Sequence, residues 1–157
     1  MVAFLVATAF LEDHEKPRVP SSEPASSSHR FRRGAAFGLA GVVKGLGIGC
    51  LKNFGVLDTL KAAVQDKGGA DGKEGALLAY ECLSEKLGRL FEPYVVSTLP
   101  SLLSCFGDSS AAVREAASAA ARTIMGQLSA QGVRLVMPAL LQGVEDKAWR
   151  TKEGSIQ

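Results

Sequence analysis

The chain has 157 residues, of which 46% are apolar and 22% charged, with a formal net charge of +2. This is an ordinary composition for a soluble globular protein, long enough for one hydrophobic core. The small net charge argues against a dedicated nucleic-acid binder, and the 6% aromatic content disfavours base-stacking platforms. We therefore expect protein partners and no direct sequence-specific nucleic-acid binding.

The N-terminal 31 residues differ in composition from the rest of the chain. Residues 1–11 form an apolar run too short for a bilayer, which takes ~20 residues, and without a basic flank. A weak signal peptide is the alternative interpretation, and we expect no membrane association. Residues 12–31 hold three prolines and a serine cluster, which cannot bury enough apolar surface to become ordered. We predict that residues 1–31 form a separate segment, with a disordered linker.

An internal repeat with a period near 40 residues organises the chain from residue 32 onward. Basic residues followed by small ones recur at steps of 41, 41 and 38 residues, and these are Arg32, Lys73, Arg114 and Lys152. An aspartate series runs in phase and comprises Asp66, Asp108 and Asp146. A period near 40 with two helices per unit is typical of HEAT or armadillo repeats. One such unit cannot bury its apolar face alone, so units stack into a solenoid.

Apolar periodicity places two helices in each repeat unit. The predicted helices are 32–47, 54–67, 73–88, 93–106, 110–128 and 132–145, followed by one that begins near Trp149. The predicted fold class is all-α, an α–α superhelix of about three units. Its domain, 32–157, holds the second helix of unit one, two full units and a truncated fourth unit. We expect a piece of a longer solenoid with apolar faces open at both ends.

Residues near the helix ends give local predictions. Pro100 lies inside a predicted helix and should bend it, because it removes one backbone hydrogen bond. Asp71, with Glu74 three residues later, is expected to cap the second helix of unit two. Asp108 and the serines after it are expected to cap the second helix of unit three.

No residue pattern supports catalysis or cofactor binding. Gly72 and Lys73 lack the other residues of a phosphate-binding loop, and residues 45–49 miss the dinucleotide-binding spacing. Both histidines, His14 and His29, fall in the predicted linker. The three cysteines are far apart, without a CxxC pair, and we expect them to be buried reduced thiols. We predict a non-enzyme without catalytic, metal or cofactor sites.

The recurring aspartates and basic residues allow two interpretations. One is a ladder of ion pairs within or between units, each worth ~0–1 kcal/mol when exposed. The other is a basic edge that faces phosphate or an acidic partner, with Trp149 as either a packing anchor or an exposed binding residue. The candidate partner-facing residues are Arg32, Arg33, Lys44, Lys52, Lys73, Arg114, Trp149, Arg150 and Lys152.

Six blocks of sequence carry a family resemblance. They are RRGAAFGLAG (32–41) with KGLG (44–47), EGAL (74–77), LGRLFEPYV (87–95), CFGD (105–108), VREAA (113–117) and WRTK (149–152). In combination they resemble the central HEAT region of the general control non-derepressible translational activators. Residues 1–31 do not resemble the preceding helices of that family.

The resemblance implies a cytosolic, ribosome-associated, non-catalytic scaffold. In amino-acid starvation such activators help to activate the kinase that phosphorylates the alpha subunit of initiation factor two. The resemblance further implies contacts with the ribosome and with an ATP-binding-cassette protein, and a likeness to fungal elongation factor three. Kinase binding belongs mainly to a later segment of the family. The alternative is a generic HEAT-repeat adaptor in another protein assembly.

Overall fold

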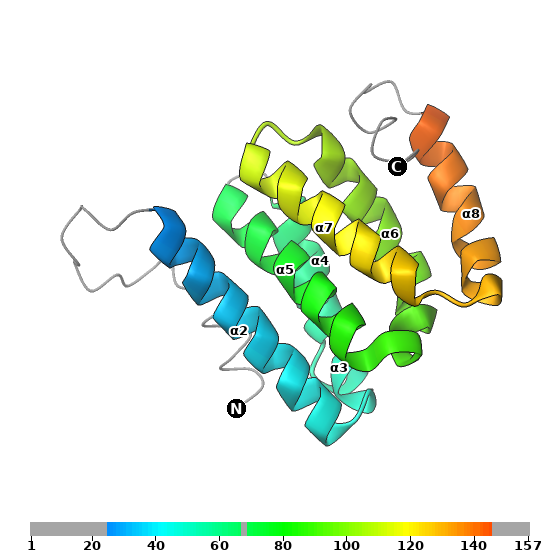
Figure 1. Cartoon of the computed structure of the whole chain (residues 1–157), viewed down its shortest axis with the longest axis horizontal. Helices are drawn as coiled ribbons and strands as arrows, with labels where there is room; N and C mark the ends of the chain where they lie inside the picture. Colours follow the sequence, from blue (N-terminus) through cyan, green and yellow to red (C-terminus); the bar gives the residue numbers. More distant parts are fainter. Residues whose placement is uncertain (1–24, 67–68, 146–157) are drawn as a thin grey trace.

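The computed structural model describes residues 25–66 and 69–145, and all regular elements within these ranges are helical (Figure 1). The α-helices are α2 (Ala25–Leu46), α3 (Gly49–Asn53), α4 (Val56–Gln65), α5 (Ala70–Leu87), α6 (Glu92–Ser104), α7 (Ala111–Gln127) and α8 (Ala130–Glu145). Two 3-10 turns, η1 (Gly88–Phe91) and η2 (Cys105–Gly107), flank α6. None of the described helices is long and apolar enough to span a bilayer. The predicted all-α fold class is confirmed.

The helices form two layers. The second helices of successive units, α2, α5 and α7, lie side by side, and α5 packs extensively against both neighbours (Figure 1). The first helices form the other layer, in which α6 contacts both α4 and α8. Each helix pair therefore stacks on the next pair, as a HEAT solenoid requires.

Helix α5 lies at the centre of the core. Residues 74–80 are buried without interruption, because α2, α7 and α4 cover the helix from different sides. Tyr80 is completely buried, as is Phe91 at the end of η1. On α7 three of the five buried residues are alanines, Ala116, Ala117 and Ala120, and their small side chains let two helices approach closely. The core is therefore continuous across the three units.

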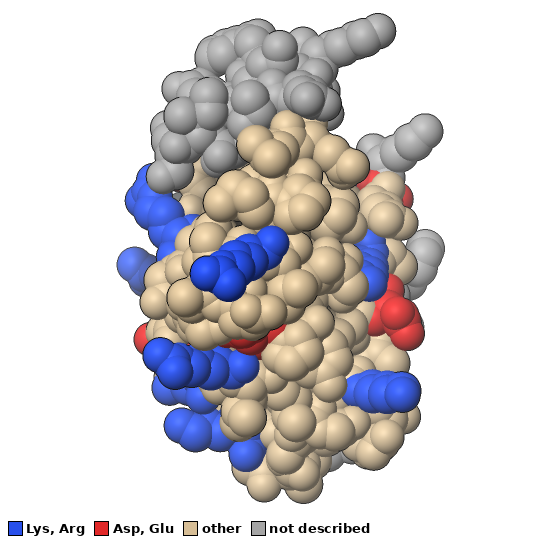
Figure 2. Space-filling model, turned by 90° about the vertical axis from the view of Figure 1, so that its right-hand side faces the viewer, with Lys and Arg blue, Asp and Glu red and all other residues tan. Residues whose placement is uncertain are grey.

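Both ends of the described helical stack expose apolar side chains. Phe31 and Phe37 on α2 are more than half exposed, as are Leu135 and Leu141 on α8. Figure 2 views the molecule from the α8 side, where uncharged residues cover most of the surface. The described residues therefore expose apolar side chains at both ends of the stack, and that these are open faces of a longer solenoid stays a prediction.

Two boundaries differ from the predicted map. Helix α2 begins at Ala25, so the predicted disorder is wrong for residues 25–31, and the earlier residues lie outside the described part. These first turns are ordered because His29 and Arg32 both contact Glu74 of α5. The first helix of unit two is preceded by a separate short helix, α3.

Two glycines explain why α3 is separate. Gly47 and Gly55 have φ values of 91° and 60°, a left-handed conformation that favours glycine and ends a helix. Between these two residues, Cys50 and Leu51 are buried and anchor α3 to the core.

The predicted helix caps also differ. Gly69 precedes α5 and Asp71 makes no cap hydrogen bond, so its predicted capping role is wrong. Asp71 instead lies in the first turn, where a negative charge is favoured by the helix dipole. Ser110 is the N-cap residue of α7, as predicted, but it makes no side-chain cap hydrogen bond, and its backbone N–H donates to Asp108 Oδ1 at 2.9 Å. Helix α6 continues through Pro100. The helix predicted near Trp149 lies outside the described residues.

Candidate functional site

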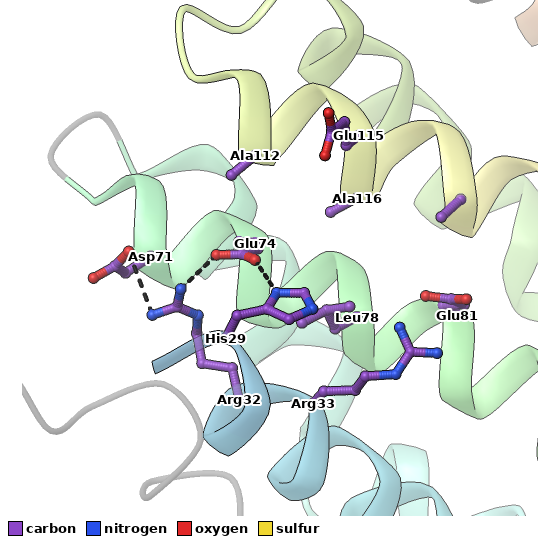
Figure 3. Close-up of a pocket in the computed structure, with 11 residues that line it drawn as sticks. His29, Arg32, Arg33, Asp71, Glu74, Leu78, Glu81, Ala112, Glu115 and Ala116 are labelled. Atoms are coloured by element: carbon purple, nitrogen blue, oxygen red, sulfur yellow. Dashed lines mark hydrogen bonds and ion pairs between the residues drawn. The ribbon is translucent and has the colours of Figure 1, made fainter. Parts of the chain in front are cut away.

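A buried ionic cluster fastens α2 to α5. Glu74 is only 5% exposed, and it accepts a hydrogen bond from Arg32 Nη2 at 2.6 Å (Figure 3). His29 Nδ1 lies 2.5 Å from the other carboxylate oxygen. The Arg32 guanidinium also lies 3.3 Å from Asp71 and donates to Ser28 Oγ at 2.6 Å. A buried carboxylate needs such partners, because desolvation otherwise penalises its charge. The cluster therefore joins unit one to unit two.

A second ion pair joins unit two to unit three. Lys73 Nζ donates to Asp108 Oδ2 at 2.7 Å, and both side chains are mostly buried. This hydrogen bond raises the pKa of Lys73 despite partial desolvation. Burial alone would raise the pKa of Asp108, but the bonds from Lys73 and the Ser110 backbone outweigh it, and the pKa is lowered. The predicted ladder is thus confirmed at this pair, between units.

The other members of the predicted ladder behave differently. Arg114 donates to the backbone carbonyls of Asp108 and Ser109, at 2.8 and 2.9 Å, and forms no carboxylate ion pair with the described residues. Asp66 is close enough to Lys73 to raise its pKa further. Asp146 and Lys152 lie outside the described residues.

A third polar contact joins unit three to unit four, and nothing in the sequence analysis anticipated it. Ser129 donates to Glu92 through its backbone N–H and its hydroxyl, both at 2.8 Å. The same hydroxyl accepts from the Gly132 backbone N–H at 3.1 Å, so Ser129 caps α8. In a local capping box, an acidic side chain at position 132 would accept the hydrogen bond from the Ser129 backbone N–H. In this chain the acceptor is Glu92, which comes from α6. The two hydrogen bonds from Ser129 lower the pKa of Glu92, and the bond from the backbone N–H has a larger effect than the bond from the hydroxyl.

The nine predicted partner-facing residues do not form one cluster. Half-buried and bonded within the solenoid are Arg32, Lys73 and Arg114. Exposed are Arg33, Lys44 and Lys52. Outside the described residues are Trp149, Arg150 and Lys152. Along α2, positions 33 and 44 are about 16 Å apart at the usual helical rise, so Arg33 lies near the middle of the helix and Lys44 in its last turn.

A groove of about 510 Å³ lies over α5, between α2 and α7 (Figure 3). Four carboxylates line it, namely Asp71, Glu74, Glu81 and Glu115. The basic residues along it are Arg32, Arg33 and, when protonated, His29. Sequence reasoning missed the groove, because it treated His29 as linker and did not pair α2 with α7 across α5.

The described residues show no constellation for metal chemistry. No three His, Cys, Asp or Glu side chains within the described ranges come together as metal ligands. The three cysteines are free and buried, as predicted. Burial raises the pKa of the Cys82 and Cys105 thiols, which disfavours the reactive thiolate.

Comparison with known proteins agrees with this architecture. The family described as the EF3 N-terminal HEAT repeat matches residues 32–157. Protein ILITYHIA of Arabidopsis thaliana is 61% identical over 132 residues, and the stalled ribosome sensor GCN1 of Homo sapiens is 53% identical over 132. The eIF-2-alpha kinase activator GCN1 of Dictyostelium discoideum is 55% identical over 133 residues.

The alignments cover most of this chain but little of each relative. They span 84% or 85% of this chain, and only 5% of the length of each of these three proteins. No solved structure matches the chain. The chain belongs to the EF3 N-terminal HEAT repeat family and is homologous to a segment of the GCN1 proteins.

Proposed function

We propose that this chain is a non-catalytic HEAT-repeat scaffold of the GCN1 type, which couples ribosomes to activation of the initiation-factor kinase in amino-acid starvation. The observation that carries the proposal is the 53–55% identity to proteins named as a stalled ribosome sensor and as an eIF-2-alpha kinase activator. A generic HEAT adaptor would share the repeat period without such identity along its sequence. The proposed location is the cytosol, on ribosomes.

The contacts between units suit a scaffold. Each of the three joins residues at least 35 positions apart in sequence, and each spans two consecutive units. A solenoid unit contacts only its neighbours, so these contacts determine how rigidly a binding surface is held. A rigid surface loses less conformational entropy when it binds.

The proposed partners are the ribosome and a kinase-activation complex that includes an ATP-binding-cassette protein. For the contact surface we propose the exposed basic residues Arg33, Lys44 and Lys52, because exposed cations attract acidic or phosphate-bearing partners. This part of the proposal rests on charge and on the family resemblance.

A genetic replacement tests the proposed function. The native gene is replaced by one that encodes glutamate at Arg33, Lys44 and Lys52, and cells are starved of amino acids. We expect less of the protein to co-sediment with ribosomes and less phosphorylation of the initiation-factor alpha subunit. The matched control is Arg134→Glu, an exposed position on α8. A gene deletion that leaves both readouts unchanged would refute the proposal, and an effect of the control equal to that of the triple variant would refute the assigned surface.

A further inference from the structure

The groove-facing stripe of α5 is acidic. Asp71, Glu74, Leu78 and Glu81 line the groove and are spaced three, four and three residues apart, which places them on one face of the helix. The stripe runs from residue 71 to residue 81, which is ten steps along the helix, or about 15 Å. On the opposite wall, α7 adds Glu115.

The two carboxylates nearer α2 already have partners. Glu74 is bound by Arg32 and His29, and Asp71 lies 3.3 Å from Arg32. These contacts use the Arg32 guanidinium, which neutralises one of the two negative charges at this end of the groove, and His29 neutralises the other when it is protonated.

The other two carboxylates are differently placed. One oxygen of Glu81 is shielded from solvent and accepts no hydrogen bond from the described residues. Glu115 is exposed and forms no ion pair with them. Arg33 extends toward Glu81 in Figure 3, but it too forms no ion pair with the described residues. A shielded carboxylate oxygen without a donor is a strong acceptor for a cation brought by a ligand.

Between these carboxylates the wall of the groove is apolar. Leu78 is buried on α5, and α7 contributes Ala112, Ala116 and Ala119, whose short side chains leave the groove open. Arginine and lysine carry an aliphatic stem that packs on apolar surface while the charged head reaches a polar group. The combination of an apolar wall and flanking carboxylates matches such a side chain.

We infer that this groove binds a basic segment of a partner protein. Its Arg or Lys heads pair with Glu81 and Glu115, and their stems lie over Leu78 and the alanines of α7. A strand of four or five residues covers about 15 Å, the length of the α5 stripe. The carboxylates repel phosphate, so the groove selects a cationic peptide over nucleic acid. Arg33 lines this groove and also belongs to the contact surface proposed above, but the test variants change only Glu81, Glu115 and Ala119 and so test the groove by itself.

Fluorescence anisotropy with the full chain tests the inference. The probe is a fluorescein-labelled octapeptide of alternating Arg and Ala, and we expect saturable, salt-sensitive binding. Glu81→Gln and Glu115→Gln should each weaken binding about tenfold, as expected for the loss of one charge pair. The matched control, Glu85→Gln, changes an exposed acid of α5 outside the groove and should have no effect. Ala119→Met should block binding without changing any charge.

Several results would overturn the inference. One is equal weakening by Glu85→Gln, which would mean unspecific attraction to surface charge. Another is equal affinity for a peptide with Glu in place of Arg. Absence of saturable binding would also exclude the site, provided that the chain keeps its helical circular dichroism. If sedimentation shows that Glu81→Gln disrupts self-association instead, the occupant is a second copy of the chain and not a basic partner.

Discussion

Arg32→Met tests whether the buried cluster at Glu74 holds α2 on α5. At the observed 2.6 Å, two unit charges attract by about 6 kcal/mol at an effective dielectric constant of ~20. Desolvation of both ions offsets several kcal/mol of this attraction. Loss of the arginine alone leaves a 5% exposed carboxylate beside His29 only. We expect a loss of about 3 kcal/mol, the lower end of the range for breaking a buried pair, because Arg32 keeps some exposure.

Urea unfolding followed by circular dichroism measures this loss through the midpoint and slope of the transition. Arg33→Met is the matched control, since Arg33 is adjacent in sequence, exposed and outside the ion pairs of the described residues. It should change the free energy of unfolding by no more than about 0.5 kcal/mol.

The double variant Arg32→Met with Glu74→Met distinguishes the net contribution of the ion pair from the cost of leaving Glu74 unpaired. Because it leaves no unpaired buried charge, we expect it to be more stable than Arg32→Met alone, within about 1 kcal/mol of the parent chain. The reasoning would be refuted if Arg32→Met cost less than about 1 kcal/mol, or if the double variant lost the sum of the two single losses.

Three further predictions concern the other unit contacts and the core. Gly132→Ala should push the Glu92 side chain away from Ser129, because a Cβ would lie 2.6 Å from Glu92 Cδ; the melting temperature should fall by no more than in Glu92→Ala, which loses the same two hydrogen bonds, and a larger fall would contradict this. Because the pKa of Asp108 is lowered in the folded chain, the Asp108 carboxylate stabilises the fold above its ordinary pKa of 3.8, and this stabilisation is lost as the pH falls through the folded pKa. Because the pKa of Lys73 is raised, the Lys73 ammonium stabilises the fold below its ordinary pKa of 10.5, and this stabilisation is lost as the pH rises through the folded pKa. When the urea midpoint of unfolding is plotted against pH, Asp108→Asn should therefore reduce the fall of the midpoint at acid pH. An unchanged profile would count against this ion pair. Cys105 should react with a thiol reagent only on unfolding, because burial raises its pKa; rapid labelling of the native chain, resolved by peptide mapping, would show otherwise.

Much of the architecture follows from patterns within single helices. Apolar spacing depends on the helical period alone, so it placed six helices near their observed positions. The period near 40 predicted paired helices and a solenoid because the apolar face of each pair must be covered by the next pair. These features are encoded locally and repeat along the chain, so one sequence was enough to recognise them.

The partners of individual side chains depend instead on how the units stack. The local sequence predicts Glu74 to be part of a helix cap, but in the structure α2 packs against it and Glu74 is a buried hydrogen-bond acceptor for Arg32. Ser129 and Glu92 meet because α8 begins beside α6, a relation that no short-range pattern contains. The groove likewise exists only because α2 and α7 flank one shared helix. Helical periodicity specifies which residues share a face, but the rotation and offset between packed helices specify which face each one meets.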